Sequence, residues 1–395
     1  MCIVAPALTQ IVTHAQRPNP VPSSSIPSPV SSEEEALRVV VERYFAAYGR
    51  KDLDGVVALW SEHSPNLAVF KEGLQQQFAS EELRFGSPTL SRIKIENERA
   101  GLRVTIPQVS INLKSRERRE RQSIRSFELA KEAGEWKIRR SVSAADELAE
   151  ALVKAGNPAE RAALLAEDQE LMTAELSEAL LERGQRLFNQ GNRNRAQEIY
   201  GQALEVAERG GDKSSIAQAL LFVGLAHRSQ GSYEQALECY RKSLGISEEL
   251  GNRDGVASAL NNIGFVHRSR GNYQQALESY QKSLEIRVGL DNKVGLGEVL
   301  GNIGFVHQAQ GHYEQALEFY QKSVKVREEL GDRAGIARTL TNISELFRAQ
   351  DKYEPALEYY QQSLRIVMEL GNQAAMQIAF SNIGLLYKLQ GDYAQ

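Results

Sequence analysis

The stretch "LNNIGFVHRSRGNYQQALESYQKSLEIR", from Leu260 to Arg287, decides the fold of this chain because it recurs with variations. The same pattern starts again at Leu300 and at Leu340, and it is already present at Leu220, so the period is 40 residues. Internal repetition at this spacing indicates a solenoid, in which each unit buries its apolar face only against its neighbours.

Each unit is expected to contain two helices. Apolar and small residues fall at helical spacing, at Ile263 and Gly264 on the first helix and at Ala276 and Tyr280 on the second, with a turn at Gly271-Asn272. The small residues let the two helices approach closely, and the tyrosine fills the volume beside them. Three columns recur along the array: Gly184, Gly224, Gly264, Gly304 and Gly384; Ala196, Ala236, Ala276, Ala316 and Ala356; Tyr200, Tyr240, Tyr280, Tyr320 and Tyr360.

Short polar motifs close the units, such as "ELGNR" at Glu249–Arg253 and "GLDNK" at Gly289–Lys293. Glycine and asparagine tolerate the left-handed conformation that ends many helices. We therefore expect the Gly or Asn of each motif to form a helix C-cap before the next unit starts.

The pattern of an aliphatic residue before Gly, then an aromatic residue or His, then Ala-x3-Tyr, resembles the tetratricopeptide repeat. The longer unit is similar to the 40-residue repeats of kinesin light chain and of the mitotic-spindle adaptor family. The pattern departs from the usual repeat at Ser344, which replaces the glycine, and it lacks a late proline. The resemblance covers about Leu180 to Gln395, as five full units and the first helix of a sixth, and it implies an all-α superhelix that binds a peptide or protein in its concave groove.

An asparagine column recurs on the first helices, two residues before the small-residue position. In tetratricopeptide families this position faces the groove, and one carboxamide offers both the donor and the acceptor that a peptide unit needs. The alternative is that these amides bond across to the adjacent unit. The column consists of Asn262, Asn302, Asn342 and Asn382.

A basic column lies nearby on the same helices, with Gln308 interrupting it. If these side chains line the groove, they favour an acidic segment or a C-terminal carboxylate as ligand. The alternative is an ordinary solvated face. The basic residues are Arg228, Arg268, Arg348 and Lys388, joined by Arg338 at the start of a first helix.

Metal and cofactor sites are not expected. His227, His267 and His307 recur once per unit, and successive units lie about 10 Å apart, too far to share one ion. Cys239 occupies a packing position, and neither it nor Cys2 has a metal-ligand spacing. The sequence also lacks a Walker loop, a G-x-S-x-G motif and a metal-ligand cluster, so we predict a chain that is not an enzyme.

Residues 32–145 have a different pattern from the repeats. Their apolar residues first follow helical spacing and then the alternating spacing of strands, with a turn at Gly134-Glu135. Helices followed by antiparallel strands predict an α+β domain. The stretches "YFAAYGRKDLDGVVALWSE" and "GEWKIRRSVS" resemble the NTF2-like, or SnoaL-like, fold, a cone with a cavity. That resemblance implies ligand binding or homodimerisation through the sheet, and Asp54 and His63 are the candidates for a catalytic base.

A basic run at Lys114–Arg125 is expected at a hairpin tip, where solvation explains it more simply than an anionic partner. The net charge of −4 gives no general attraction to nucleic acid, so no nucleic-acid partner is expected. We interpret the N-terminal domain as a second candidate site, which binds or transforms a small molecule while the repeats act as a scaffold.

Two segments remain, an N-terminal segment at residues 1–31 and a connector between the two domains at residues 146–179. Residues 1–31 combine a signal-like apolar run with a Pro/Ser-rich linker, which favours export or a periplasmic location over a cytoplasmic one. Residues 146–179 form a helical, Glu/Ala/Leu-rich connector. The connector and the repeats at 180–395 resemble the front part of bacterial repeat proteins that end in a CHAT protease domain. Because Gln395 falls halfway through a unit, we expect this chain to be the sensing or recruiting part of a longer signalling protein.

Overall fold

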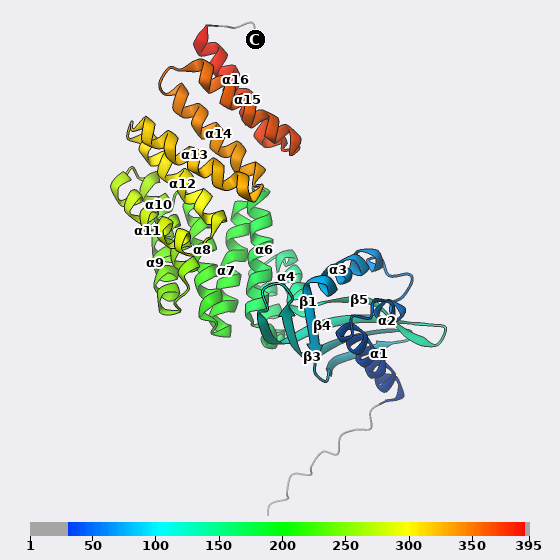
Figure 1. Cartoon of the computed structure of the whole chain (residues 1–395). Helices are drawn as coiled ribbons and strands as arrows, with labels where there is room; N and C mark the ends of the chain where they lie inside the picture. The colour runs from blue at the N-terminus through cyan, green and yellow to red at the C-terminus, as the bar shows by residue number, and fades with distance from the viewer. Residues whose placement is uncertain (1–30, 392–395) are drawn as a thin grey trace, which may run out of the picture. The chain divides into compact units, whose positions relative to one another are not determined.

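The computed structural model describes residues 31–391, and these divide into two compact units (Figure 1). The first unit takes the chain as far as Ser123 together with Phe127–Ser141, and the second takes Ile124–Ser126 and everything from Val142 onward. The expected signal-like run and linker lie outside the described residues except for Ser31, which caps the first helix through a hydrogen bond from the Glu34 amide. No helix within the described range is both long and apolar enough to cross a membrane.

The N-terminal unit places three helices before a five-stranded antiparallel sheet, which confirms the α+β prediction. The strand order is β1-β3-β4-β5, and β2 also pairs with β3. The helices are α1 (Ser32–Gly49), α2 (Leu53–Ala58) and α3 (Leu67–Ser80). The strands are β1 (Glu81–Phe85), β2 (Thr89–Glu96), β3 (Arg99–Asn112), β4 (Arg118–Glu132) and β5 (Glu135–Ser143).

One long strand organises this sheet. The first half of β3 pairs with β2, where Arg99 is opposite Glu96, and its second half pairs with β1, where Asn112 is opposite Glu81. The turn before β5 is formed by Ala133 and Gly134, whose φ angles are 49° and 86°. Such a pair is typical of a tight two-residue hairpin. The predicted turn at Gly134-Glu135 was therefore one residue late, because Glu135 already belongs to β5.

A single apolar cluster fills the space between the helices and the sheet of this unit. Tyr44 and Phe45 of α1 pack edge-to-face against Phe127 of β4, and Trp60 stacks on Phe70 with ring centroids 4.1 Å apart. Aromatic pairs of this kind stabilise a core beyond the area that they bury. The fold class is thus clear, whereas the NTF2-like identity stays a prediction.

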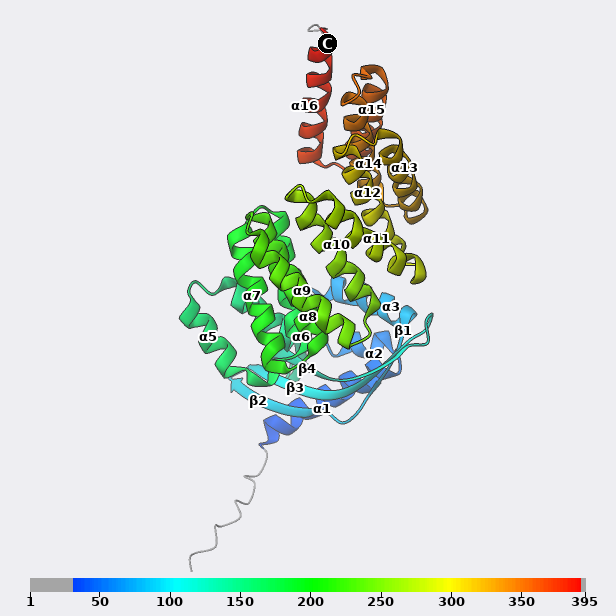
Figure 2. The same cartoon turned by 90° about the vertical axis from the view of Figure 1, so that its left-hand side faces the viewer.

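The second unit is a solenoid of helix pairs from α6 onward, each packed against the next (Figure 2). Five pairs are followed by a single helix. The pairs are α6 (Ala174–Asn189) with α7 (Arg193–Gly210), α8 (Lys213–Ser229) with α9 (Tyr233–Glu249), α10 (Arg253–Ser269) with α11 (Tyr273–Gly289), α12 (Lys293–Ala309) with α13 (Tyr313–Leu330), and α14 (Arg333–Arg348) with α15 (Tyr353–Glu369); the last helix is α16 (Gln373–Gln390).

The glycine and tyrosine columns explain how closely each pair packs. A Cβ atom added to Gly264 would lie 2.7 Å from the Tyr280 ring, which is closer than side chains tolerate. Tyr280 itself is fully buried. In the α14–α15 pair, Ser344 takes the place of the glycine and its hydroxyl donates to the Leu340 carbonyl.

A buried serine column, not singled out from the sequence, ties the two helices of each pair together. Each serine hydroxyl donates to a first-helix carbonyl at 2.6–2.8 Å in three consecutive pairs. Buried hydroxyls need such partners. The bonds join Ser243 to Ala217, Ser283 to Ala257 and Ser323 to Gly297.

The residues of the unit-closing motifs cap the helices in a different way from the prediction. Gly251 has φ 65°, as expected, but Asp291 takes the equivalent left-handed position at φ 51°. Asn252 instead accepts a hydrogen bond from the Gly255 amide, so it is the N-cap of α10. The expectation that asparagine forms the C-cap was therefore wrong, because its side chain satisfies a free amide of the next helix.

The connector caps the first repeat unit. Helices α4 (Ala144–Lys154) and α5 (Pro158–Glu167) and the short 3-10 helix η1 (Gln169–Leu171) share an apolar cluster with α6 and α7. The first repeat helix begins at Ala174, earlier than the predicted Leu180. The helical connector therefore ends where the first repeat unit begins.

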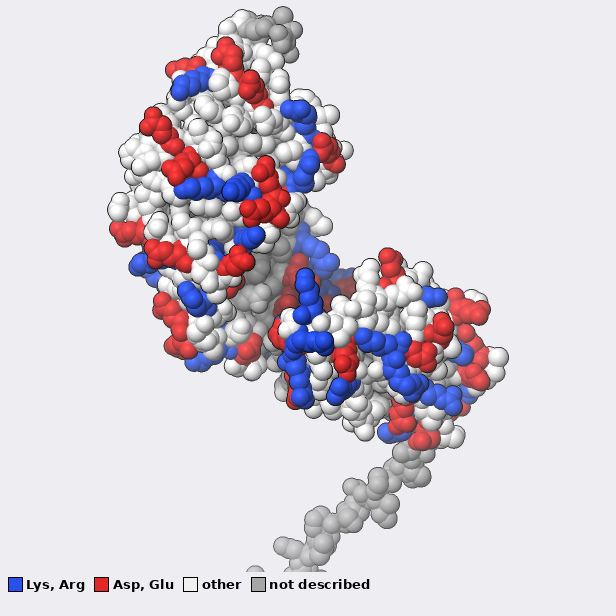
Figure 3. Space-filling view, viewed as in Figure 1, with Lys and Arg blue, Asp and Glu red and all other residues white. Residues whose placement is uncertain are grey.

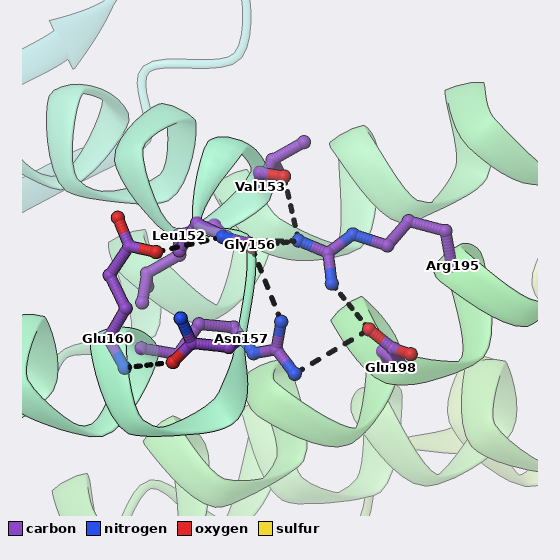
Figure 4. A network of polar contacts seen from close by, with 9 residues as sticks. Leu152, Val153, Gly156, Asn157, Glu160, Arg195 and Glu198 are labelled. Carbon is purple, nitrogen blue, oxygen red and sulfur yellow. Dashed lines mark hydrogen bonds and ion pairs between the residues drawn. The ribbon is translucent and has the colours of Figure 1, made fainter.

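Arg195 of α7 fastens this connector to the repeats (Figure 4). Its Nη2 donates to the carbonyls of Leu152, Val153 and Ala155, at 3.3, 2.7 and 3.0 Å. Its Nη1 pairs with Glu198. The guanidinium therefore satisfies carbonyls at the C-terminal end of α4 that would otherwise lack helical partners.

The last helix packs on the preceding unit with one apolar face and leaves another apolar side chain exposed. Leu386 is fully buried in a cluster with Ala356 and Tyr360 of α15, and Ile383 packs beside it. Through this face the first helix of the last unit packs on the second helix of the preceding unit. Phe380 is 56% exposed, whereas Leu340 at the equivalent position of α14 is 7% exposed.

Candidate functional site

A cavity of the solenoid unit lies along the first helices of its last three units. Its volume is about 850 Å³, which is ample for a peptide segment. The helices α12, α14 and α16 supply most of its wall, and α10, α13 and α15 supply the rest. Four of the predicted binding residues line it, namely Arg268, Asn302, Arg338 and Asn342.

A chain of polar contacts borders this cavity. Arg268 donates from Nη1 to the Oδ1 of Asn302 at 3.1 Å, and the Nδ2 of Asn302 donates to Asn261 at 3.0 Å. Asn261 in turn donates to the carboxylate of Glu298 at 2.9 Å. These contacts hold the Asn302 amide in one orientation beside the cavity.

Aromatic rings hold the arginines of the same face. The guanidinium of Arg268 lies between two rings, 4.1 Å from the Phe265 centroid and 4.5 Å from that of Phe305. Arg228 stacks on the other side of Phe265 at 3.9 Å. Burial lowers the pKa of Arg268 from its usual value, although the group stays charged at neutral pH. The result is a stack of alternating cations and rings across α8, α10 and α12.

The asparagine column divides into two groups. Asn262 accepts from Arg228 at 3.0 Å and donates to the Ser258 carbonyl, so Asn262 and Asn302 make the contacts between units that the alternative interpretation anticipated. Asn342 and Asn382 are half-buried, and their side chains make no hydrogen bond within residues 31–391. Of these two, Asn342 lines the cavity and Asn382 does not.

The basic column is similarly divided. Arg338 is exposed, lines the cavity and forms no ion pair with any described residue. Arg348 is bound to the Glu345 carboxylate, which raises the pKa of the arginine, and it does not line the cavity. Lys388 is exposed on α16, outside the cavity.

Apolar side chains also line the cavity. Ile378 and Val294 are 61% and 72% exposed, and Leu370 is 46% exposed. Small residues of α16, among them Ala374 and Ala375, complete the wall. The cavity therefore combines hydrogen-bonding groups with uncovered apolar side chains.

The histidines and the cysteine behave as packing residues. Ring centroids of His307 and Phe319 lie 5.4 Å apart in a stacked arrangement, and burial lowers the pKa of both His267 and His307. Burial also raises the pKa of the half-buried Cys239 thiol. Within residues 31–391, no cluster of His, Cys, Asp and Glu side chains could hold a metal ion.

The candidate bases of the N-terminal unit do not form a site. The side chain of His63 is 83% exposed, with its Nδ1 3.8 Å from a Glu132 oxygen, and Asp54 is exposed in the first turn of α2. A cavity of about 580 Å³ lies over the sheet of this unit, but neither residue lines it. At the basic tip, Arg118 and Arg119 pair with Glu120 and Glu117, as the solvated interpretation expects.

Sequence reasoning missed the residues that position the predicted ones. Phe265 and Phe305 recur at the 40-residue period, so their column could have been found in the same way as the asparagines. Glu298 and Asn261 occur once each in their columns and carry no periodic signal. Only the packed structure shows that they support Asn302.

The tetratricopeptide repeat family model matches four overlapping segments, at residues 175–249, 215–288, 255–329 and 295–369. This part of the chain therefore consists of tetratricopeptide repeats, which confirms that prediction. The matches leave the N-terminal unit uncovered. No curated protein matches the chain.

Solved structures are similar to part of this chain at low identity. BtubC (BKLC) from P. vanneervenii is 20% identical over 58% of this chain and 94% of its own, with a TM-score of 0.46. The Rap conjugation gene regulator of plasmid pLS20, in complex with the Phr* peptide, is 14% identical over 57% of this chain and 61% of its own, at 0.50. Repeats of a putative kinesin light chain from Podosopora anserina are 13% identical over 50% of this chain and 96% of their own, at 0.40.

Proposed function

We propose that the chain is an interaction scaffold whose repeats bind a peptide or protein segment in the cavity lined by α12, α14 and α16. The observation that carries this proposal is the Asn342 carboxamide, which borders the cavity and makes no hydrogen bond with any described residue. A single carboxamide can accept from one peptide N–H and donate to the C=O of the same residue. Asn302 offers a similar group one unit earlier, already oriented by Arg268.

Two further features support a peptide rather than a small molecule. The cavity is elongated over three units and open, with hydrogen-bonding groups at intervals along it. The Rap regulator, which resembles this chain in fold only, is described in complex with a peptide, so a solenoid of this kind can hold one.

The test selects binders from a random-peptide library on the full chain and measures their affinity for variants. Asn342→Ala should weaken binding about tenfold, because two hydrogen bonds to the peptide are lost. Asn272→Ala is the matched control, since Asn272 caps no amide and lies on the turn before α11, outside the cavity. Binding that is equally strong in the wild-type chain and in Asn342→Ala would contradict the proposal.

The N-terminal unit is the second candidate, as an NTF2-like domain that binds a small molecule or forms a homodimer. Its cavity of about 580 Å³ is the feature that supports this alternative. Native mass spectrometry of the purified full chain should then show a retained small molecule or a dimer. The resemblance to the sensing part of CHAT-containing repeat proteins also stays a prediction.

A further inference from the structure

We infer that the peptide ligand carries an acidic side chain and, at least about three residues away, a large apolar side chain. This inference rests on the proposed function and adds the chemistry of the ligand. Its basis is a set of three side chains, one from each of α12, α14 and α16, that occupy equivalent positions of the repeat and line the cavity. These are Glu298, Arg338 and Ile378, each lining the cavity and each 40 residues from the last.

Glu298 and Arg338, at the first two positions, differ in the contacts that their charged groups already make. The carboxylate of Glu298 already accepts a hydrogen bond from Asn261, within the network that ends at Arg268. Arg338 forms no ion pair with a described residue, although its charge helps to lower the pKa of Asp332, the carboxylate that pairs with Arg327. A second cavity cation, Arg327, is neutralised by Asp332 at 2.5 Å. Arg338 is thus the exposed cation of the cavity that a ligand can pair with.

The cavity has a small excess of positive charge, because Arg268, Arg327 and Arg338 line it together with only two carboxylates, those of Glu298 and Asp332. Arg228 and Arg268 contact only neutral amides and aromatic rings, and neither has an ion pair within the described range. Other cations of the solenoid pair with carboxylates of the adjacent unit, as Lys213 does with Glu249 and Lys293 with Glu329. Figure 3 shows Lys/Arg and Asp/Glu side chains side by side on the solenoid face in view. Unpaired arginines therefore set the cavity face apart from those paired surfaces, and they favour an acidic ligand.

The position after Arg338 is apolar and uncovered. Ile378 is 61% exposed, although aliphatic side chains gain from burial, and the adjoining wall contains Leu370 and Val367. A leucine, phenylalanine or methionine of the ligand would cover this surface. Its burial would supply affinity, whereas the acidic residue would fix the register.

The spacing follows from the geometry of the solenoid. Helix α15 packs against both α14 and α16, whereas α14 and α16 make few direct contacts with each other. Packed helices lie about 10 Å apart, so α14 and α16 are at least that far apart, and an extended chain advances about 3.4 Å per residue. A residue placed over α14 and one placed over α16 are therefore separated by at least about three positions. A free C-terminal carboxylate alone would satisfy Arg338 but leave Ile378 uncovered, so we commit to an acidic side chain within the segment.

The experiment uses the binders selected from the random-peptide library on the full chain. The inference predicts enrichment of Asp or Glu at a fixed spacing of at least about three positions from a large apolar residue, in either direction. Replacing the acidic residue with its amide should weaken binding to the wild-type chain about fivefold, and should have little effect in Arg338→Gln, because the pair is already broken there. Arg365→Gln is the control, since Arg365 is exposed on α15 in a separate cavity of about 500 Å³.

The outcomes separate the two proposals. Binders that require Asn342 but show no acidic and apolar pattern would overturn this inference and leave the proposed function standing. Binders whose affinity depends only on a free C-terminus, lost on amidation, would also overturn it. If no selected peptide is sensitive to Asn342→Ala, or if none binds, the proposed function itself fails.

Discussion

Arg268 on α10 donates a hydrogen bond to the side chain of Asn302 on α12, so adjacent repeat units are joined at the edge of the candidate groove. This contact gives Asn302 a structural task that Asn342 lacks. The two members of one sequence column should therefore respond differently to the same substitution.

Asn302→Ala should lower the stability of the array, whereas Asn342→Ala should leave it nearly unchanged. The first removes two hydrogen bonds and leaves Arg268 and Asn261 with lost partners, at a cost of about 1–2 kcal/mol. Both substitutions should weaken peptide binding. Urea unfolding followed by circular dichroism checks the stability, and equal midpoints for the two variants would contradict the assigned contacts.

Gly264→Ala should destabilise the α10–α11 pair by about 1–3 kcal/mol, because the new methyl group would meet the Tyr280 ring. Gly384 occupies the equivalent position of α16 but has no atom within 4 Å of an added Cβ. Gly384→Ala should therefore be neutral or stabilising, since alanine favours helix. Thermal unfolding of the two variants provides the comparison, and a similar loss in both would show that steric clash is not the cause.

Arg195→Gln should loosen the connector from the first repeat unit. Gln235, Gln275 and Gln315 occupy the equivalent positions of later units, so glutamine is compatible with the helix. The loss of the bonds to three carbonyls should raise amide hydrogen exchange in α4 about tenfold or more. Gln275→Ala is the control, and unchanged exchange in α4 would mean that apolar packing alone holds the connector.

Acidification should destabilise the repeats through His267 and His307. Burial is the main cause that lowers the pKa of both histidines. The charges of Arg241 and Arg270 lower the pKa of His267 further, and those of Glu234 and Glu278 raise it in part. His312 lowers the pKa of His307 further. The unfolded chain, with a histidine pKa of about 6.5, then binds protons first as the pH falls. The stabilising contribution is thus complete above about pH 6.5 and declines as the pH drops toward the lower folded-state pKa values.

The matching experiment compares melting temperatures from about pH 7 to about pH 5 in the wild type and in His267→Phe with His307→Phe. Phe347 holds the equivalent position in α14, so phenylalanine fits the column. The double variant should lose less stability on acidification. An identical decline in both proteins would assign the effect to other groups.

The solenoid could be predicted from the sequence because its determinants repeat. A column such as Gly264 with Tyr280 records the same packing in every unit, and a period of 40 residues makes it visible. The α+β character of the first unit was equally accessible from the change in hydrophobic spacing. The errors were local, as at Asn252, where the same residue type suits either end of a turn.

The candidate site was only partly predictable. The asparagine and arginine columns mark the face, but the sequence could not show that Arg348 is bound to Glu345 while Arg338 has no ion pair among the described residues. That difference depends on single, non-repeated partners. The exposure of Phe380 has a related cause, because among the described residues helix α16 packs mainly against α15 of the preceding unit.

The most direct test of the account is a crystal structure of the full chain with the tightest peptide from the library. The account predicts the peptide backbone within hydrogen-bonding distance of the Asn342 side chain, in the cavity lined by α12, α14 and α16. A peptide bound instead between α13 and α15, or on the N-terminal unit, with that cavity empty, would contradict it.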